Sequence, residues 1–214
     1  MVEHDGIGLR ERKKLMTRKA ILEVAETMFA ERGFDNVTVA EIADAVNISA
    51  KTLFVYFPAK DDLVFADEDR VRDTIIAHIR DRAVGRTPLD AMGDLLRELM
   101  SASGPHAVAG LDRLLRMVGD NAVLNPRMRL MWERFEDALA AYLAQETGVG
   151  RHAPAPRVAA AQLILVFRLL ASADVLAYLQ SFPKRRQTAA FNGWLAESLE
   201  LVGTGIADYA PRPA

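Results

Sequence analysis

Residues 20–64, AILEVAETMFAERGFDNVTVAEIADAVNISAKTLFVYFPAKDDLV, decide the fold of this chain. Four apolar residues at its start share one face of a helix at helical spacing, namely Ile21, Ala25, Met28 and Phe29. The helical pattern extends back to about Leu9. Gly33 can end the helix, because glycine adopts the backbone that a helix C-terminus needs. We therefore expect a helix over 9–32.

A short helix should follow, with a specific start signal. Thr38 and Glu41 have the spacing of a capping box, in which the threonine hydroxyl accepts from the glutamate amide and the glutamate side chain reaches back. Val37 and Ile42 occupy the positions of a hydrophobic staple across this helix start. The pattern predicts a helix that begins just after Thr38.

A tight turn and a second short helix come next. Asn47 tolerates the left-handed backbone of a tight turn, and Ser49 can cap the following helix. That helix should span Ala50 to Phe57, because Pro58 lacks the amide needed to continue it. Leu53 is spaced to face the core with Phe57. This order of elements is that of a helix-turn-helix, whose second helix enters the major groove of DNA.

The same stretch resembles the DNA-binding domain of the TetR family of transcriptional regulators. The resemblance rests on Phe29-x-x-x-Gly33-Phe34, on Thr38-x-x-x-Ile42-Ala43, and on the block from Leu53 through Tyr56-Phe57 to Lys60. It implies an all-α protein. Residues 1–58 would form an N-terminal three-helix helix-turn-helix DNA-binding domain with a basic N-terminal segment. Residues 59–214 would form a larger C-terminal helical domain for effector binding and dimerisation.

The basic segment and the resemblance together predict a DNA-contacting set: Arg10, Lys13, Lys14, Arg18, Thr38, Ser49, Ala50, Lys51, Thr52, Phe54, Tyr56 and Lys60. Lys51 can donate to guanine O6 and N7 or can contact a phosphate instead. Thr38 lies at a helix start where exposed amides accept a phosphate, and its alternative role is a purely structural cap. Phe54 stands where the family often has tyrosine, so an apolar contact with a thymine methyl would replace a hydroxyl contact.

Charge is segregated along the chain. The formal net charge is −2, but six cations lie between Arg10 and Lys19 with Glu11 as the one acid among them. DNA binding needs only such a local basic stripe. The alternative interpretation is a solvated helix face. Lys60 resembles the phosphate-binding lysine of the family, and Ala59 before it is a weaker helix cap than the usual serine or asparagine.

The rest of the chain also has helical patterning. A fourth helix is expected from near Lys60 to about Arg82, and later helices over Leu89–Ala102, Ala107–Val118, Arg127–Thr147, Pro156–Gln180 and Lys184–Gly203. The resemblance implies that the last two of these pair with their copies in a homodimer.

The effector domain offers five candidate pocket residues: Met117, Trp132, Phe135, Phe167 and Arg168. The aromatic residues and Met117 can instead be core residues. Arg168 can bind an acidic effector, or it can lie at an interface or extend to solvent.

Several classes of protein do not fit the sequence. It contains no cysteine, which excludes disulfides and thiolate metal sites. Its charged start lacks the apolar run of a secretory signal, and the apolar stretch 158–179 is interrupted by Gln162, Arg168 and Asp174. We find no catalytic or metal-binding motif. The resemblance implies a repressor that a small-molecule effector releases from a pseudo-palindromic operator, and we expect it to be cytoplasmic, without a cofactor or enzymatic activity. The alternative is an all-helical small-molecule-binding protein or enzyme whose N-terminal helices are structural.

Overall fold

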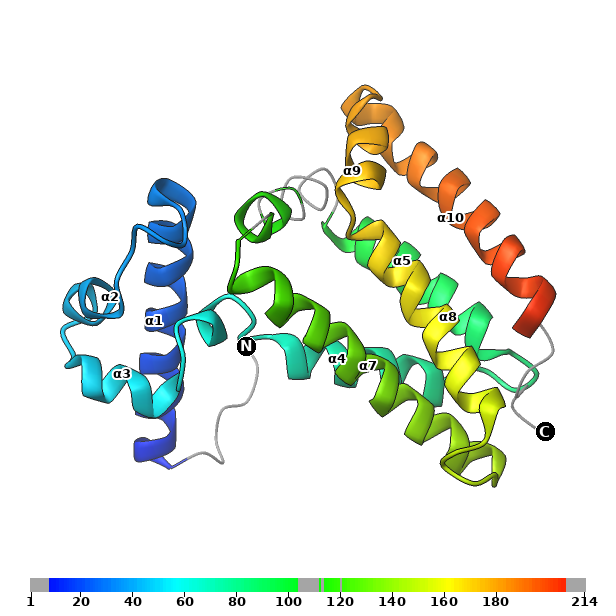
Figure 1. Cartoon of the computed structure of the whole chain (residues 1–214), viewed down its shortest axis with the longest axis horizontal. Helices are drawn as coiled ribbons and strands as arrows, with labels where there is room; N and C mark the ends of the chain where they lie inside the picture. The colour runs from blue at the N-terminus through cyan, green and yellow to red at the C-terminus, as the bar shows by residue number, and fades with distance from the viewer. Residues whose placement is uncertain (1–7, 104–111, 113, 120, 207–214) are drawn as a thin grey trace. The chain divides into compact units, whose positions relative to one another are not determined.

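The structure, a computed structural model, describes residues 8–103, 112, 114–119 and 121–206 (Figure 1). No strand occurs within these ranges, and the predicted all-α fold class is confirmed. The chain divides into two compact units, Met1–Ala66 and Asp67–Ala214. The first unit thus extends eight residues past the domain boundary expected after residue 58.

The first unit contains α1 (Leu9–Arg32), α2 (Val39–Ala45), α3 (Ala50–Tyr56) and a single 3-10 turn, η1 (Asp61–Leu63). Each helix contributes apolar residues to one small core, whose members include Ile21, Ala25, Phe29, Ile42, Ala43 and Leu53. The loops add Phe34, Val37 and Phe57, all at most 6% exposed. The helix predicted over 9–32 is confirmed at both ends.

The continuous helix predicted from near Lys60 to Arg82 is wrong. Only η1 forms at its start, and α4 begins at Glu68 and ends at Arg80. Leu63 and Phe65 explain the break, because both are buried, each 6% exposed, in the first unit. A continuous helix through this segment could not bury Leu63 and Phe65 and at the same time bury the apolar face of α4.

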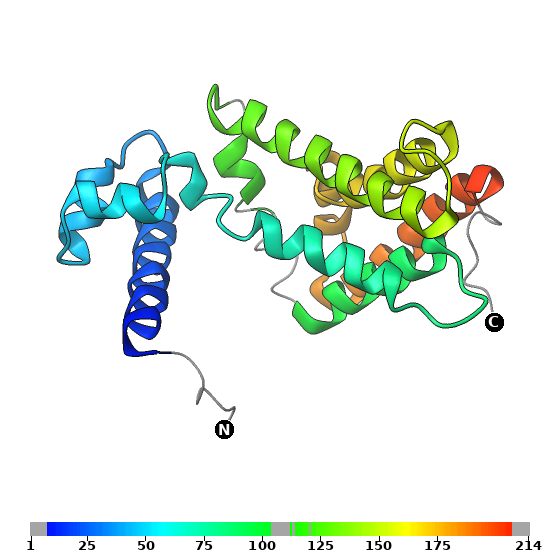
Figure 2. The same cartoon turned by 90° about the horizontal axis from the view of Figure 1, so that it is seen from below.

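The second unit is a layered helical bundle of α4 (Glu68–Arg80), α5 (Pro88–Ser103), α7 (Leu124–Thr147), α8 (Pro154–Leu170), α9 (Ala173–Gln180) and α10 (Lys184–Ile206). Helices α7 and α8 pack along each other, and α5 packs between α4 and α10 (Figure 2). Their shared core includes Ile79, Met92, Leu139, Leu143, Leu163 and Leu195. Of the helix predicted over 107–118, residues 112 and 114–118 are helical, and the others lie outside the described residues.

The single helix predicted over Pro156–Gln180 is also wrong, because α8 and α9 are separate. Ala171 and Ser172 break it, and Ser172 has an extended backbone (φ −105°, ψ 153°). Its hydroxyl accepts from the amide of Val175 at 3.4 Å, which caps α9. The break bends the chain by 48° between the two helices.

Within the described residues, none of the helices is by itself both long and apolar enough to span a membrane. Taken together, α8 and α9 reach that length and composition, but only as a bent pair.

Two ion-pair clusters join α4 to α7, one near each end of α4. Near its start, Glu68 lies 2.7 Å from Arg127 and 3.0 Å from Arg134. Just beyond its end, the Arg82 guanidinium donates to both carboxylate oxygens of Glu146, at 3.0 and 2.9 Å. The Arg82 side chain is 2% exposed and the Glu146 side chain 22%, so the cation of this second cluster is buried and its carboxylate is partly exposed.

Candidate nucleic-acid interface

The start of α2 has the predicted capping box. The Thr38 hydroxyl accepts from the Glu41 amide at 3.2 Å, and the Thr38 amide donates to the Glu41 carboxylate at 2.7 Å. Arg32, at the end of α1, also donates to this carboxylate at 2.7 Å. The hydrogen bonds from Thr38, with the help of Arg32, lower the pKa of Glu41 from about 4.5 to about 2. One carboxylate therefore fixes α2 to the end of α1.

The turn between α2 and α3 forms as the sequence predicts. Asn47 has a positive φ of 55°, the left-handed backbone that reverses the chain in a tight turn. The Ile48 amide donates to the carbonyl of Ala43 at 3.0 Å, which closes the turn. The Ser49 hydroxyl then accepts from the Thr52 amide at 3.0 Å and caps α3. Both ends of the turn are thus fixed by hydrogen bonds.

Helix α3 separates into a buried face and an exposed face. Leu53 (0% exposed) and Phe57 (3%) point into the core, as predicted. Lys51 is exposed and has no ion-pair partner among the described residues. Phe54 is 46% exposed and Val55 77%. These side chains therefore form a surface that the protein itself does not cover.

The remaining predicted contacts on α3 and its cap differ in exposure. Ser49 and Thr52 are exposed and their hydroxyls lie 2.8 Å apart, while Ala50 and Tyr56 are half-buried. Val55, also on the exposed face of α3, was not among the predicted DNA contacts. Its position four residues after Lys51 could have shown that it shares the exposed face, since residues i and i+4 are neighbours on a helix.

Lys60 and Arg18 were both predicted to contact DNA. In the structure, both side chains are held by contacts within the first unit. The Lys60 ammonium donates to the Phe34 carbonyl at 2.5 Å and lies 4.1 Å from the centre of the Phe34 ring. Burial lowers the pKa of Lys60. Arg18 donates to the Ala66 carbonyl at 2.9 Å and stacks over the ring of Phe57. In this arrangement both cations stabilise the unit, and a phosphate would have to compete for them.

The predicted basic segment is the N-terminal part of α1. Arg10, Lys13 and Lys14 are exposed, and the first fully buried residue of this helix is Ile21. About three turns of α1 therefore extend beyond the core of the unit and present cations to solvent.

A hollow of about 500 Å³ in the second unit brings together two of the predicted effector-pocket residues, Trp132 and Arg168. Phe135 is a core residue, 3% exposed, with its ring 5.6 Å from that of Trp132. Phe167 is half-buried, with its ring 5.7 Å from Trp132. Met117 is half-buried and does not line the hollow.

Other residues of this hollow were not predicted. Met128, Arg129 and Glu133 come from the same face of α7 as Trp132, and Ser172 comes from the break between α8 and α9. The available signal was their spacing: Met128 and Arg129 lie at i−4 and i−3 from Trp132, and Glu133 lies at i+4 from Arg129. Ser172 escaped prediction because the break itself was missed.

The first unit defines the class of protein. A braced helix, a left-handed turn and a capped, exposed second helix are the elements of a helix-turn-helix. The family model described as "Bacterial regulatory proteins, tetR family" matches residues 21–66, which is most of the described part of this unit, residues 8–66. This match assigns residues 21–66 to the tetR family of bacterial regulatory proteins.

Known proteins agree with this assignment. The HTH-type transcriptional regulator TcmR of Streptomyces glaucescens is 31% identical over 139 residues, covering 65% of this chain and 58% of TcmR. The chain thus matches less than two thirds of the length of that relative.

Solved structures share the fold over most of both chains. NalD of Pseudomonas aeruginosa, a repressor of the MexAB-OprM multidrug efflux pump, aligns with a TM-score of 0.56 at 20% identity and covers 92% of this chain and 100% of its own. FadR of Bacillus subtilis, solved in complex with stearoyl-CoA, aligns with a TM-score of 0.54 at 18% identity over 88% of this chain and 98% of FadR.

Proposed function

We propose that this protein is a transcriptional repressor, not an enzyme, that binds a pseudo-palindromic operator through α3 and leaves it when a small-molecule effector binds the second unit. The main observation that supports this proposal is the exposed face of α3. Its cation, Lys51, is unpaired among the described residues, and its inward residues Leu53 and Phe57 are fully packed. Such a helix is positioned by its own core and keeps one face available for base edges.

The operator-binding form is a cytoplasmic homodimer, assembled through α8 and α10. Both helices keep large apolar side chains at the surface: Val158 is 52% exposed and Leu169 40% on α8, and Leu201 is 72% exposed on α10. Burying such side chains against a second copy is favourable. Two copies of α3 would then read half-sites about 34–36 Å apart, one turn of DNA.

The effector site is the hollow beside Trp132 and Arg168. Its lining combines an aromatic ring, the apolar Met128 and the cation Arg168 with the polar Ser172, a mixture typical of small-molecule sites. Arg168 also lies near Glu136, whose pKa is raised by burial and partly lowered again by Arg168. Through α7 this hollow is connected to α4, because Arg127, the residue before the lining residue Met128, pairs with Glu68.

The test is selection of bound sequences from random double-stranded DNA by the full chain, followed by titration of the selected duplex at several salt concentrations. We expect a palindromic sequence. Lys51→Ala distinguishes the two roles left open for this side chain. Loss of a guanine contact would cost about 1–3 kcal/mol and relax specificity at one position in each half-site. Loss of a phosphate contact would weaken all sequences alike and reduce the log–log salt slope by about one.

Arg80→Ala is the matched control, since it removes one positive charge outside the basic segment and outside α3. Arg80 is exposed and pairs with Asp81 at 2.8 Å, which offsets its charge locally. Selection of no common sequence, or an equal effect of the two substitutions, would exclude α3 as the reading element.

A further inference from the structure

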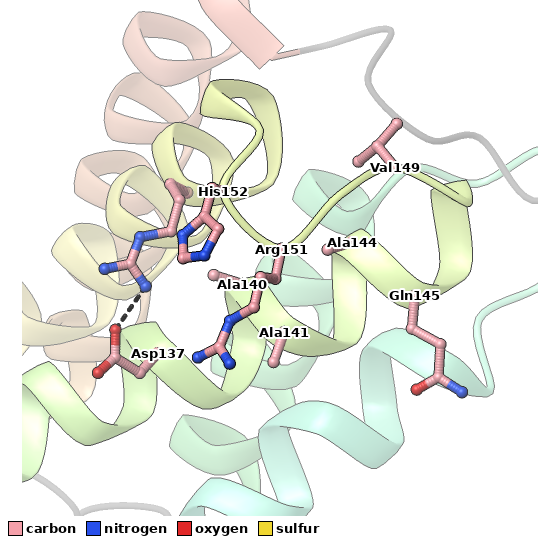
Figure 3. Close-up of a pocket in the computed structure, with 9 residues that line it drawn as sticks. Asp137, Ala140, Ala141, Ala144, Gln145, Val149, Arg151 and His152 are labelled. Atoms are coloured by element: carbon pink, nitrogen blue, oxygen red, sulfur yellow. Dashed lines mark hydrogen bonds and ion pairs between the residues drawn. The ribbon is translucent and has the colours of Figure 1, made fainter.

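A second hollow in the second unit, of about 710 Å³, lies where α7 ends and α8 begins (Figure 3). It shares no lining residue with the hollow beside Trp132. Three alanines of α7 form one wall of it, Ala140, Ala141 and Ala144, and their short side chains leave the space open. The proposed repressor function does not assign any role to this hollow.

The hollow has an excess of positive charge. Arg151 and Arg157 line it with a single carboxylate, Asp137, and His152 adds an imidazole ring. Arg157 donates to Asp137 at 2.6 Å, the contact drawn as a dashed line in Figure 3. Arg151 has neither an ion-pair nor a hydrogen-bond partner in the part of the chain that the structure describes. One guanidinium is thus available, and the other already holds a carboxylate.

The loop that carries Arg151 and His152 is short and fixed at both ends. Gly148 ends α7 with a left-handed backbone (φ 69°), and the Val149 amide donates to the Ala144 carbonyl at 3.1 Å. The Ala153 amide then donates to the Gly150 carbonyl at 2.8 Å, directly before the prolines of α8. Because the loop is ordered before a ligand arrives, binding there would cost little conformational entropy.

We propose that this hollow binds a small organic anion through a carboxylate or phosphate group. Arg151 and Arg157 hold the anionic group, because the planar guanidinium matches both oxyanions with paired hydrogen bonds. The alanines of α7 and the 43% exposed Val149 contact the apolar part of the ligand. Asp137 competes with that ligand for Arg157, so this carboxylate limits the affinity of the site.

Titration of the full-length protein, followed by the backbone amide signals of Gly148 and Gly150, tests the site. Octanoate and inorganic phosphate are the two probes, and they distinguish a carboxylate ligand from a phosphate ligand. We expect at least one to shift both signals with a Kd of about 1 mM, typical of a few charged hydrogen bonds to a small ligand. No shift with either probe at about 10 mM, ten times that Kd, would overturn the proposal.

Two substitutions should change the affinity in opposite directions. Arg151→Gln removes the free guanidinium and should weaken binding about tenfold. Asp137→Asn removes the competing carboxylate and should tighten binding about threefold. Arg168→Gln, a matched control in the other hollow, should leave the affinity unchanged. If Arg168→Gln weakens binding and Arg151→Gln does not, the probe binds beside Trp132 and the proposed site is wrong.

Discussion

The exposed cations of the first unit and the buried Arg82 of the second unit serve different purposes. In the first unit, Lys51 and the basic start of α1 are exposed and contribute little to the packing of the unit itself. In the second unit, Arg82 is 6% exposed and makes hydrogen bonds that hold two helices together. Exposed cations can be exchanged without harm to the fold, whereas a buried one cannot. The difference separates residues whose loss should affect DNA binding from residues whose loss should unfold the protein.

The largest effect on stability is expected from Arg82→Ala. Besides the ion pair with Glu146, the Arg82 guanidinium donates to the carbonyls of Ile79 and Arg86, at 2.6 and 2.9 Å. Its removal takes this donor away from both carbonyls and leaves the Glu146 carboxylate with the Tyr142 hydroxyl at 3.0 Å. Because the Glu146 side chain is 22% exposed and can be partly hydrated, we expect a loss of about 3 kcal/mol, near the lower end for buried pairs.

Urea denaturation measures this loss. Arg80→Ala is the control, because Arg80 pairs with its neighbour Asp81 at the surface, where both side chains are more than half exposed. We expect that control to change the free energy of unfolding very little. Similar losses for Arg80→Ala and Arg82→Ala would show that burial of the Arg82 pair does not stabilise the second unit.

A smaller effect is expected from Thr38→Ala in the first unit. The substitution removes the hydroxyl that accepts from the Glu41 amide and should lower the free energy of unfolding of this unit by about 1 kcal/mol. Thr27→Ala makes the same chemical change in the middle of α1 and should stabilise it slightly, because alanine has the higher helix propensity. Urea denaturation, monitored by hydrogen exchange in α1 and α2, would compare the two variants. An increase in stability on Thr38→Ala would show that the Thr38 hydroxyl does not stabilise the start of α2.

The first unit could be predicted from sequence because local signals determine it. Thr38, Asn47, Ser49 and Pro58 each act within a few residues of themselves, and the structure follows these four signals closely. The positions of long side chains in the first unit could not be predicted in the same way. Nothing local shows that Lys60 turns toward the carbonyl of Phe34, since that contact joins residues 26 positions apart.

The second unit was predicted less well because its site depends on contacts between distant segments. Capping signals existed at Ser172, before α9, and at Thr87 with Asp90, before α5, where the same reciprocal hydrogen bonds form as at α2. Apolar residues on both sides of Ser172 continue the helical pattern, and for that reason a single helix was predicted there despite the capping signal of Ser172. The pairing of Arg82 with Glu146 spans 64 positions and has no local signature.

The smallest effect is expected from lowering the pH, which tests how far the capping box at the start of α2 depends on the charge of Glu41. The pKa of Glu41 lies at about 2 in the folded unit and near 4.5 when the side chain is free. The stabilisation is therefore complete above about pH 4.5 and is lost as the pH falls toward 2, where the folded carboxyl also gains its proton. Glu41→Gln keeps a hydrogen-bonding side chain but cannot titrate. At pH 6 the wild type should have a larger free energy of unfolding than Glu41→Gln. Urea denaturation should show that this difference in free energy becomes steadily smaller from pH 5 to pH 3. A difference that does not change over this range would mean that the hydrogen bonds of Glu41, and not its charge, fix α2 to α1.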